Sequence, residues 1–182
     1  PYEPLIGDVE FVPYDDADAL DEAVDEDTAA FIVEPVQGEG GINPTSPGYL
    51  EAAREITEDA GAALIFDEVQ TGMGRTGALW NSTRAAVAPD MITSAKGLGN
   101  GLPIGATLCQ DWIADEYGSH ASTFSGGPVI SAAAGATVST LIEDSVPGNA
   151  AVVGDYLQTE LEAAIGDEVR DIRGEGLMIG VE

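Results

Sequence analysis

Polar residues follow three apolar segments that have the composition of β-strands. Glu34 follows the first segment, Asp67 and Gln70 follow the second, and Lys96 follows the third. Ligands of parallel sheets collect at the carboxyl ends of the strands, because loops and helix N-termini converge there. Lys96 is also the only lysine of the chain. The pattern predicts a ligand site at this edge of a sheet.

Lys96 and Asp67 have the side chains that the chemistry of pyridoxal 5′-phosphate requires. A partly buried lysine has a lowered pKa and, as the free amine, is a nucleophile toward aldehydes. An acid beside a pyridine nitrogen keeps the ring protonated, so that it can accept electrons from a carbanion. The pair also has simpler interpretations: Lys96 could be a surface lysine, and Asp67 could cap a helix or pair with Arg75.

The segment HASTFSGG, residues 120–127, is a candidate anion site. It precedes Pro128, which is typical of the first position of a helix. The hydroxyls of Ser122 and Thr123, together with backbone N–H groups at a helix start, could bind a phosphate. An ordinary capped loop is the alternative interpretation.

Other kinds of site fit the sequence less well. Residues 97–102 lack the third glycine of a dinucleotide-binding fingerprint, and no Gly-Lys-Ser/Thr run is present to bind a nucleoside triphosphate. His120 is the only histidine, and no Gly-x-Ser-x-Gly segment presents a nucleophile for it to activate. Cys109 is the only cysteine, so we expect no internal disulfide and no Cys/His metal site.

The chain is strongly acidic, with 33 Asp and Glu against 6 Lys and Arg and a formal net charge of −27. Nucleic acids and anionic membranes bind basic surfaces, so neither is expected as a partner. Hydrophobic residues make up 44% of the chain, but no apolar run approaches the ~20 residues of a membrane span. We expect a soluble, cytoplasmic protein. Its acidic surface suits concentrated salt, so we expect a halophilic source. An acidic protein from an ordinary source is the alternative interpretation.

Apolar and polar residues alternate in segments that predict an α/β fold, with a mostly parallel sheet flanked by helices. Leu20, Ala23 and Val24 form the apolar stripe of a helix over residues 16–27, and a helix over residues 47–60 begins at Ser46 as N-cap and ends at Gly61. Further helices are predicted from Asp111 and over residues 128–143 and 149–164. Strands are predicted over residues 29–36, 62–66, 91–94, 106–109, 169–173 and 177–181.

Pro147 and Gly148 indicate a domain boundary. We expect residues 1–146 to form part of a large domain and residues 147–182 to begin a small C-terminal α+β domain. The chain starts without Met and stops inside a predicted strand, so we expect an incomplete polypeptide.

Five segments resemble, in order, the motifs of the class III aminotransferases, which are fold-type I enzymes that depend on pyridoxal phosphate. The segments are EPVQGEGG (34–41), IFDEVQTGMGRTG (65–77), SAKGLGNGLPIGA (94–106), STFSGG (122–127) and RGEGLMIGVE (173–182). The resemblance covers almost the whole chain and implies the fold-type I architecture and pyridoxal 5′-phosphate as cofactor.

The resemblance implies a role for each cofactor-binding residue. Lys96 would carry the cofactor as a Schiff base and, once displaced by substrate, would move a proton between the substrate and the cofactor. Asp67 would bind the pyridine nitrogen, Val69 would pack on the ring, Gln70 would contact the ring hydroxyl, and Thr123 would bind the phosphate, commonly that of a partner subunit.

Substrate contacts are also implied by the resemblance. Ser122 and Glu39 would lie on the substrate side, with Glu34 supporting the site nearby. Arg173 is not expected to bind the substrate carboxylate, because the family's arginine lies further along than this chain extends. In the loop at residues 120–127, Ala121, Ser125 and Gly127 replace Gly, Gly and Asn of the usual family pattern.

The resemblance implies transfer of an ω-amino group to 2-oxoglutarate. The amino donor would be N-acetylornithine or a lysine or ornithine precursor on an amino-group carrier protein, in arginine or lysine biosynthesis. Alternatives are 4-aminobutyrate or ornithine aminotransferase, a glutamate-semialdehyde aminomutase, or a non-catalytic acidic binding module. Family members act as homodimers of more than twice this length, so we expect these residues alone to be inactive.

Overall fold

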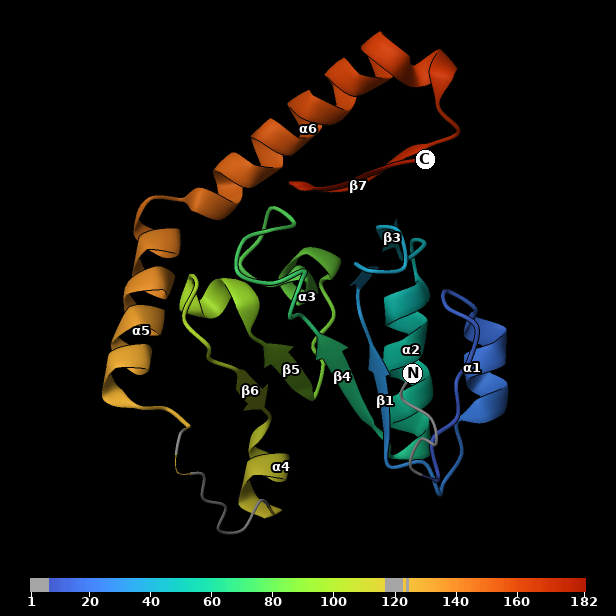
Figure 1. Ribbon diagram of the computed structural model, residues 1–182. Helices are drawn as coiled ribbons and strands as arrows, with labels where there is room; N and C mark the ends of the chain where they lie inside the picture. The colour runs from blue at the N-terminus through green and yellow to red at the C-terminus, as the bar shows by residue number, and fades with distance from the viewer. Residues whose placement is uncertain (1–6, 117–122, 124) are drawn as a thin grey trace.

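A four-stranded sheet lies at the centre of the fold (Figure 1), in a computed structural model that describes residues 7–116, 123 and 125–182. The strand order is β1-β4-β5-β6, in which the first three strands are parallel and β6 is antiparallel to β5. The mostly parallel α/β sheet predicted from the sequence is therefore confirmed. The strand bounds are β1 Ala30–Val33, β4 Ala63–Asp67, β5 Met91–Ser94 and β6 Ala106–Cys109.

The first predicted strand is shorter than expected, because β1 ends at Val33, before Pro35, which has no backbone N–H to continue a ladder. Val36 and Gln37 instead form β2 (Val36–Gln37), which pairs with β3 (Asn43–Pro44) in a small antiparallel sheet. The sequence analysis did not predict this pair, since two-residue strands have no readable periodicity.

The first helix, α1 (Ala17–Ala23), begins at Asp16 as N-cap but ends four residues before the predicted position. A turn follows, in which the hydroxyl of Thr28 donates to Asp25 Oδ1 and the N–H of Asp25 donates to the Thr28 hydroxyl. Such local side-chain bonds compete with helix continuation. Of the predicted apolar stripe, only Leu20 is buried.

The second helix, α2 (Tyr49–Ala60), ends at Gly61 as predicted, with a left-handed φ of 75°. Its predicted N-cap is wrong. Ser46 donates through both its N–H and its hydroxyl to Asp15 Oδ1, at 2.8 and 3.1 Å, and Gly48 takes the cap position with a φ of 91°. The serine side chain is therefore engaged by another segment of the chain and cannot cap the helix.

The two faces of the sheet differ in what covers them. One face packs on α1 and α2 to form the core, whose buried residues include Val33, Leu64 and Phe66. Successive side chains of a strand alternate between faces, so Ile65 and Asp67 lie on the other face. Neither of these two residues is buried. Asp67 therefore lies at the carboxyl end of β4 on the less covered face.

The rest of the chain extends beyond the sheet in helices and a hairpin (Figure 1). The hairpin pairs β7 with β8. The first strand starts three residues later than predicted, whereas the second starts one residue later and ends at the predicted position. Pro147 and Gly148, the predicted boundary residues, lie in the first turn of α6. The bounds are α3 Asn81–Ala85, α4 Asp111–Glu116, α5 Pro128–Glu143, α6 Val146–Ile165, β7 Ile172–Glu175 and β8 Met178–Val181.

The turn of the β7–β8 hairpin is held between α6 and the loop that follows β4. A side chain at Gly154 of α6 would overlap the backbone of Gly176 in the hairpin turn. Gly176, with a φ of 53°, packs in turn against the backbone of Thr76 and Gly77. The N–H of Leu177 donates to the carbonyl of Arg75 at 3.0 Å. Glycine is required at residues 154 and 176 because three backbone segments meet there.

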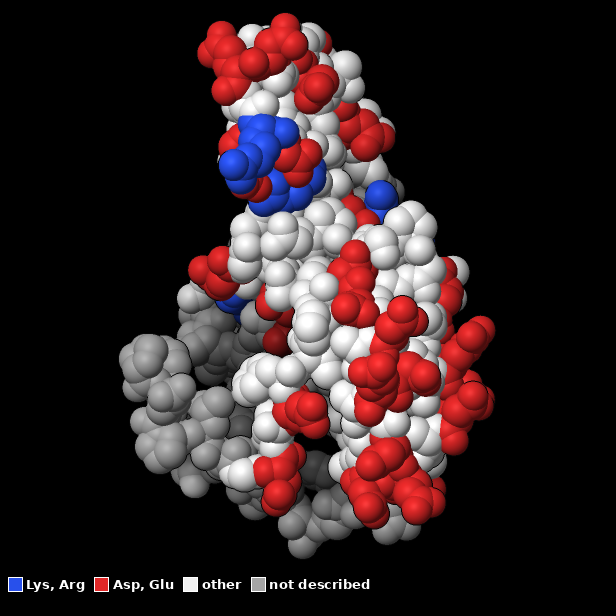
Figure 2. Space-filling model, turned by 90° about the vertical axis from the view of Figure 1, so that its right-hand side faces the viewer, with Lys and Arg blue, Asp and Glu red and all other residues white. Residues whose placement is uncertain are grey.

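Acidic side chains dominate the surface shown in Figure 2, where most of the visible basic side chains form one cluster and the others lie apart from it. Among the described residues no helix is long and apolar enough to cross a membrane. Close spacing of like charges destabilises a compact chain, and salt shortens the range of that repulsion from about 30 Å at 0.01 M to about 3 Å at 1 M.

We predict that molar KCl stabilises the complete protein. Raising KCl from about 0.05 M to about 2 M should increase the melting temperature by several degrees, because screening reduces the self-repulsion of a net charge of −27. Differential scanning calorimetry measures the shift. A melting temperature that stays constant across this range would show that the acidity is unrelated to salt.

Candidate active site

Asp67 is held by two hydrogen bonds to the same carboxylate oxygen. Its Oδ1 accepts from the N–H of Val69 at 3.0 Å and from the hydroxyl of Thr93, on the neighbouring strand, also at 3.0 Å. No described residue donates to Oδ2. Asp67 caps no helix and makes no ion pair with Arg75 in the described part of the chain, so the two simpler interpretations of this residue are wrong.

Lys96 begins the 3₁₀ turn Lys96–Gly99, two residues after β5. Its φ is 40°, in the left-handed region that costs a non-glycine residue about 1 kcal/mol or more. Lys96 is exposed, so the predicted partial burial is wrong for this structure. The glycines at positions 97, 99 and 101 have no side chains with which to cover the amine.

A cavity of about 360 Å³ brings several predicted residues together. Lys96, Val69 and Gln70 all line it. Asp67 does not line it, but its Oδ1 accepts a hydrogen bond from the N–H of Val69, which does. The remaining wall comes from Ile42, from the loop after β4, from the turn after β5 and from the hairpin. These residues are Ile42, Gly72, Met73, Arg75, Gly97, Leu177, Met178 and Ile179.

The positive charges of the chain are distributed unevenly around this cavity. Lys96 and Arg75 both line it, and neither makes an ion pair with a described residue. Each of the other four cations lies within ion-pair distance of a carboxylate: Arg54 of Asp90, Arg84 of Glu175, Arg170 of Glu182, and Arg173 of Asp171 and Glu182. The two uncompensated cations make the cavity suitable for an anion.

Gln70 is backed by the loop that follows β1. A side chain at Gly38 would overlap the Gln70 amide unless the glutamine side chain moved away. The Gly38 N–H donates to Glu34 Oε2 at 3.1 Å. Glu34 therefore fixes the loop that contacts Gln70, and it does not line the cavity itself.

Glu68 organises the site, although the sequence analysis did not identify it. Its side chain is fully buried, and its two oxygens accept from the N–H groups of Asn81 at 2.5 Å and Ser82 at 2.9 Å. Thr71 also donates to it, at 3.4 Å. Burial raises the pKa of Glu68, against the opposing effect of these hydrogen bonds. The position of Glu68 directly after Asp67 is the one sequence feature that could have drawn attention to it. Nothing in the sequence predicts that its side chain is buried.

Other predicted residues lie outside the cavity lining. Glu39 and Thr123 are exposed and do not line the cavity, and Ser122 lies outside the described residues. Arg173 donates to the carbonyls of Gly41 and Ile42 at 2.8 and 2.9 Å. This arginine thus fastens the hairpin to the β2–β3 segment, consistent with the expectation that it does not bind substrate.

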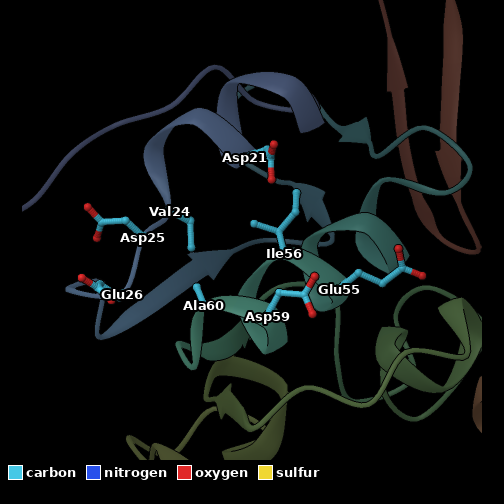
Figure 3. Close-up of a pocket in the computed structure, with 8 residues that line it drawn as sticks. All are labelled: Asp21, Val24, Asp25, Glu26, Glu55, Ile56, Asp59 and Ala60. Carbon is cyan, nitrogen blue, oxygen red and sulfur yellow. The ribbon is translucent and has the colours of Figure 1, made fainter.

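A second hollow, of about 490 Å³, lies between α1 and α2 (Figure 3). Val24, Ile56 and Ala60 line it together with five acids: Asp21, Asp25, Glu26, Glu55 and Asp59. No cluster of metal-ligating side chains occurs in the residues that the structure describes. This hollow has no feature beyond its carboxylates that points to a ligand.

Comparison with known proteins gives one family. The family model described as "Aminotransferase class-III" matches residues 4–182. The chain is 47% identical over 179 residues to the acetylornithine aminotransferase of Methanosarcina acetivorans, covering 98% of this chain and 45% of that protein. It is 44% identical over 186 residues to the [LysW]-aminoadipate semialdehyde/glutamate semialdehyde transaminase of Sulfurisphaera tokodaii, covering 100% of this chain and 48% of that protein.

Solved structures agree on the fold. The ornithine aminotransferase of Toxoplasma gondii, whose active site holds PLP at partial occupancy, superposes with a TM-score of 0.93 at 35% identity, over 100% of this chain and 44% of that one. The fold-type I architecture expected from the sequence is confirmed. The chain spans about half the length of the relatives that it matches.

We predict that Glu68→Gln destabilises the complete protein by about 1–3 kcal/mol, because the amide N–H₂ of glutamine would face a backbone donor at Asn81 or Ser82. Urea unfolding measures the loss. Glu55→Gln, which removes an exposed carboxylate from α2, is the matched control and should leave the free energy of unfolding almost unchanged.

The same variant has a pH signature. Because the folded state raises the pKa of Glu68, it binds this proton more tightly than the unfolded state. The resulting stabilisation is complete below the unfolded pKa and is lost as the pH rises through the folded pKa. The stability difference between wild type and Glu68→Gln should therefore narrow with rising pH, and a difference that widens would contradict this assignment.

Proposed function

The chain belongs to the class III aminotransferases, and on this basis we propose that the complete protein transfers the ω-amino group of N-acetylornithine, or of a lysine or ornithine precursor on a carrier protein, to 2-oxoglutarate. The main support is that Lys96, Val69 and Gln70 line one cavity, and that Asp67 accepts a hydrogen bond from Val69. These residues come from the loops after two neighbouring parallel strands, where a ligand of such a sheet is expected.

Class III aminotransferases use pyridoxal 5′-phosphate, and the side chains present fit it. No described residue donates to Oδ2 of Asp67, because both of its hydrogen bonds are to Oδ1. Oδ2 can therefore accept a hydrogen bond from a protonated ring nitrogen. Lys96 provides a primary amine on the same cavity as Val69 and Gln70. When bound, the cofactor supplies an electron sink for the carbanion that forms at the substrate.

Each residue has a defined part in the proposed reaction. Lys96 attaches the cofactor through its Nζ and afterwards moves a proton at the substrate carbon. Asp67 accepts a hydrogen bond from the ring nitrogen and keeps it protonated. Val69 packs on the ring, and Gln70 binds beside the ring hydroxyl. Thr123 is proposed to bind phosphate, and Glu39 and Ser122 to lie on the substrate side.

The charge of the cavity supports an anionic substrate. Arg75 and Lys96 are the two cations without a described ion-pair partner, and both line it. In a chain with a net charge of −27, most of the surface repels a dicarboxylate such as 2-oxoglutarate. An anion is therefore attracted to this cavity more than to the surrounding acidic surface.

Ornithine aminotransferase is the second candidate, because the Toxoplasma gondii enzyme of that name matches the whole chain with a TM-score of 0.93. Steady-state assays of the complete protein with N-acetylornithine, ornithine and 4-aminobutyrate as donors distinguish these functions. We further propose that the complete protein acts in the cytoplasm as a homodimer, and that an amino-group carrier protein could present the donor, as the name of the Sulfurisphaera tokodaii transaminase suggests.

We predict that borohydride reduction of the complete protein with its cofactor fixes a pyridoxyl group on Lys96, because this residue lines the same cavity as Val69 and Gln70. Peptide mass mapping identifies the labelled residue. Lys96→Ala should abolish both the label and the transfer activity. A label outside Lys96, or activity that survives Lys96→Ala, would overturn the proposal in favour of a non-catalytic binding module.

We predict that Arg75→Gln raises the KM for 2-oxoglutarate by about tenfold or more, since hydrogen bonds to charged groups contribute about 1.5–3 kcal/mol. The affinity for pyridoxal phosphate should be unaffected. Arg170→Gln removes an arginine that is already paired with Glu182 and serves as the control. Equal KM values for the two variants would show that Arg75 does not bind the acceptor.

A further inference from the structure

Thr93 lies directly beside Asp67 on the neighbouring parallel strand. The two residues are register partners in the β4–β5 ladder, and both are partly buried. The Thr93 hydroxyl donates to Asp67 Oδ1 at 3.0 Å. The carbonyl of the same threonine accepts the N–H of Glu68 at 3.0 Å, so its backbone is fixed to the residue that follows Asp67.

The Thr93 hydroxyl restricts the orientation of the Asp67 carboxylate. Threonine is β-branched, so its χ1 is restricted and the direction of the hydroxyl is limited. The second donor to Oδ1, the N–H of Val69, approaches from the loop after β4. One bond from the sheet and one from the loop thus fix a single oxygen of the carboxylate. The other oxygen, Oδ2, accepts from no described residue.

We propose that Thr93 is a positioning residue, whose hydroxyl holds Oδ1 of Asp67 so that Oδ2 is presented to the protonated ring nitrogen of the cofactor. This inference rests on the proposed function. Thr93 does not line the cavity, so it acts through Asp67 rather than by contact with substrate.

A purely structural role for Thr93 makes a different prediction. Valine has nearly the same shape as threonine, is β-branched and fits strands well. If Thr93 only fills its place in β5, Thr93→Val should leave the cofactor site unchanged. If the hydroxyl positions Asp67, the variant should loosen the carboxylate while the sheet stays intact.

The test compares three variants of the complete protein. Thr93→Val removes the hydroxyl, and Thr93→Ser retains it. Thr107→Val is the control. Thr107 lies on β6 and pairs with Thr93 across the strand edge opposite β4, and its hydroxyl makes no hydrogen bond to Asp67. The measurements are the equilibrium Kd for pyridoxal phosphate, the ¹⁵N chemical shift of the labelled ring nitrogen, and kcat and KM for the donor.

Thr93→Val should raise the Kd for pyridoxal phosphate by about tenfold, as expected for loss of one hydrogen bond to a charged group. The ring-nitrogen shift should move toward that of the unprotonated ring. The value of kcat should fall while the KM for the donor stays within about twofold. Thr93→Ser should restore these values, and Thr107→Val should match the wild type.

Wild-type Kd and ring-nitrogen shift in Thr93→Val would overturn this inference, as would an equal effect of Thr107→Val. Urea unfolding checks that each variant is folded, and Thr93→Ala provides a second removal of the hydroxyl if Thr93→Val does not fold. If the wild type itself binds no cofactor at Lys96, the proposed function fails as well. A wild type that is labelled at Lys96, with an unaffected Thr93→Val, refutes the role of Thr93 alone.

Discussion

The carboxylate of Glu68 accepts hydrogen bonds from the N–H groups of Asn81 and Ser82, and it connects the end of β4 to the start of α3. The intervening loop contains Val69, Gln70 and Arg75, which line the cavity. A buried carboxyl is costly unless its oxygens are satisfied, so the chain has little freedom in how it closes this loop. The neighbouring Asp67 is thereby free to face the other side of the sheet. The end of β4 thus places a structural acid and a candidate functional acid side by side in the sequence but in different environments, with Glu68 fully buried and Asp67 partly exposed.

Strands and strand ends were predictable from this sequence because they depend on short-range patterns. The apolar segments before Asp67 and Lys96 correspond closely to β4 and β5, and Gly61 ends α2 through the left-handed conformation that glycine favours. Val69, Gln70 and Lys96, which were predicted from separate segments, line one cavity, while their roles in binding a cofactor stay predictions. In these cases local composition and the fold favour the same structure.

The features that the sequence analysis missed depend on residues distant in the chain. Ser46 does not cap α2 because Asp15, thirty-one positions earlier, takes both of its donors. Thr93 reads as an ordinary strand residue until the register of β4 and β5 places it opposite Asp67. The exposure of Lys96 likewise depends on which distant segments pack against the turn after β5. Tertiary pairing decides each of these features, and no periodicity within a single segment encodes it.

The junction of Gly154, Gly176 and the Thr76–Gly77 backbone has a mechanical consequence. Main-chain atoms pack there without intervening side chains, so no rotamer change can absorb a displacement. The hairpin and the loop after β4 both supply walls of the same cavity, so this junction sets the spacing of those walls. A substitution at residue 154 of α6 would push the hairpin turn away from the loop and alter the cavity without touching any residue that lines it.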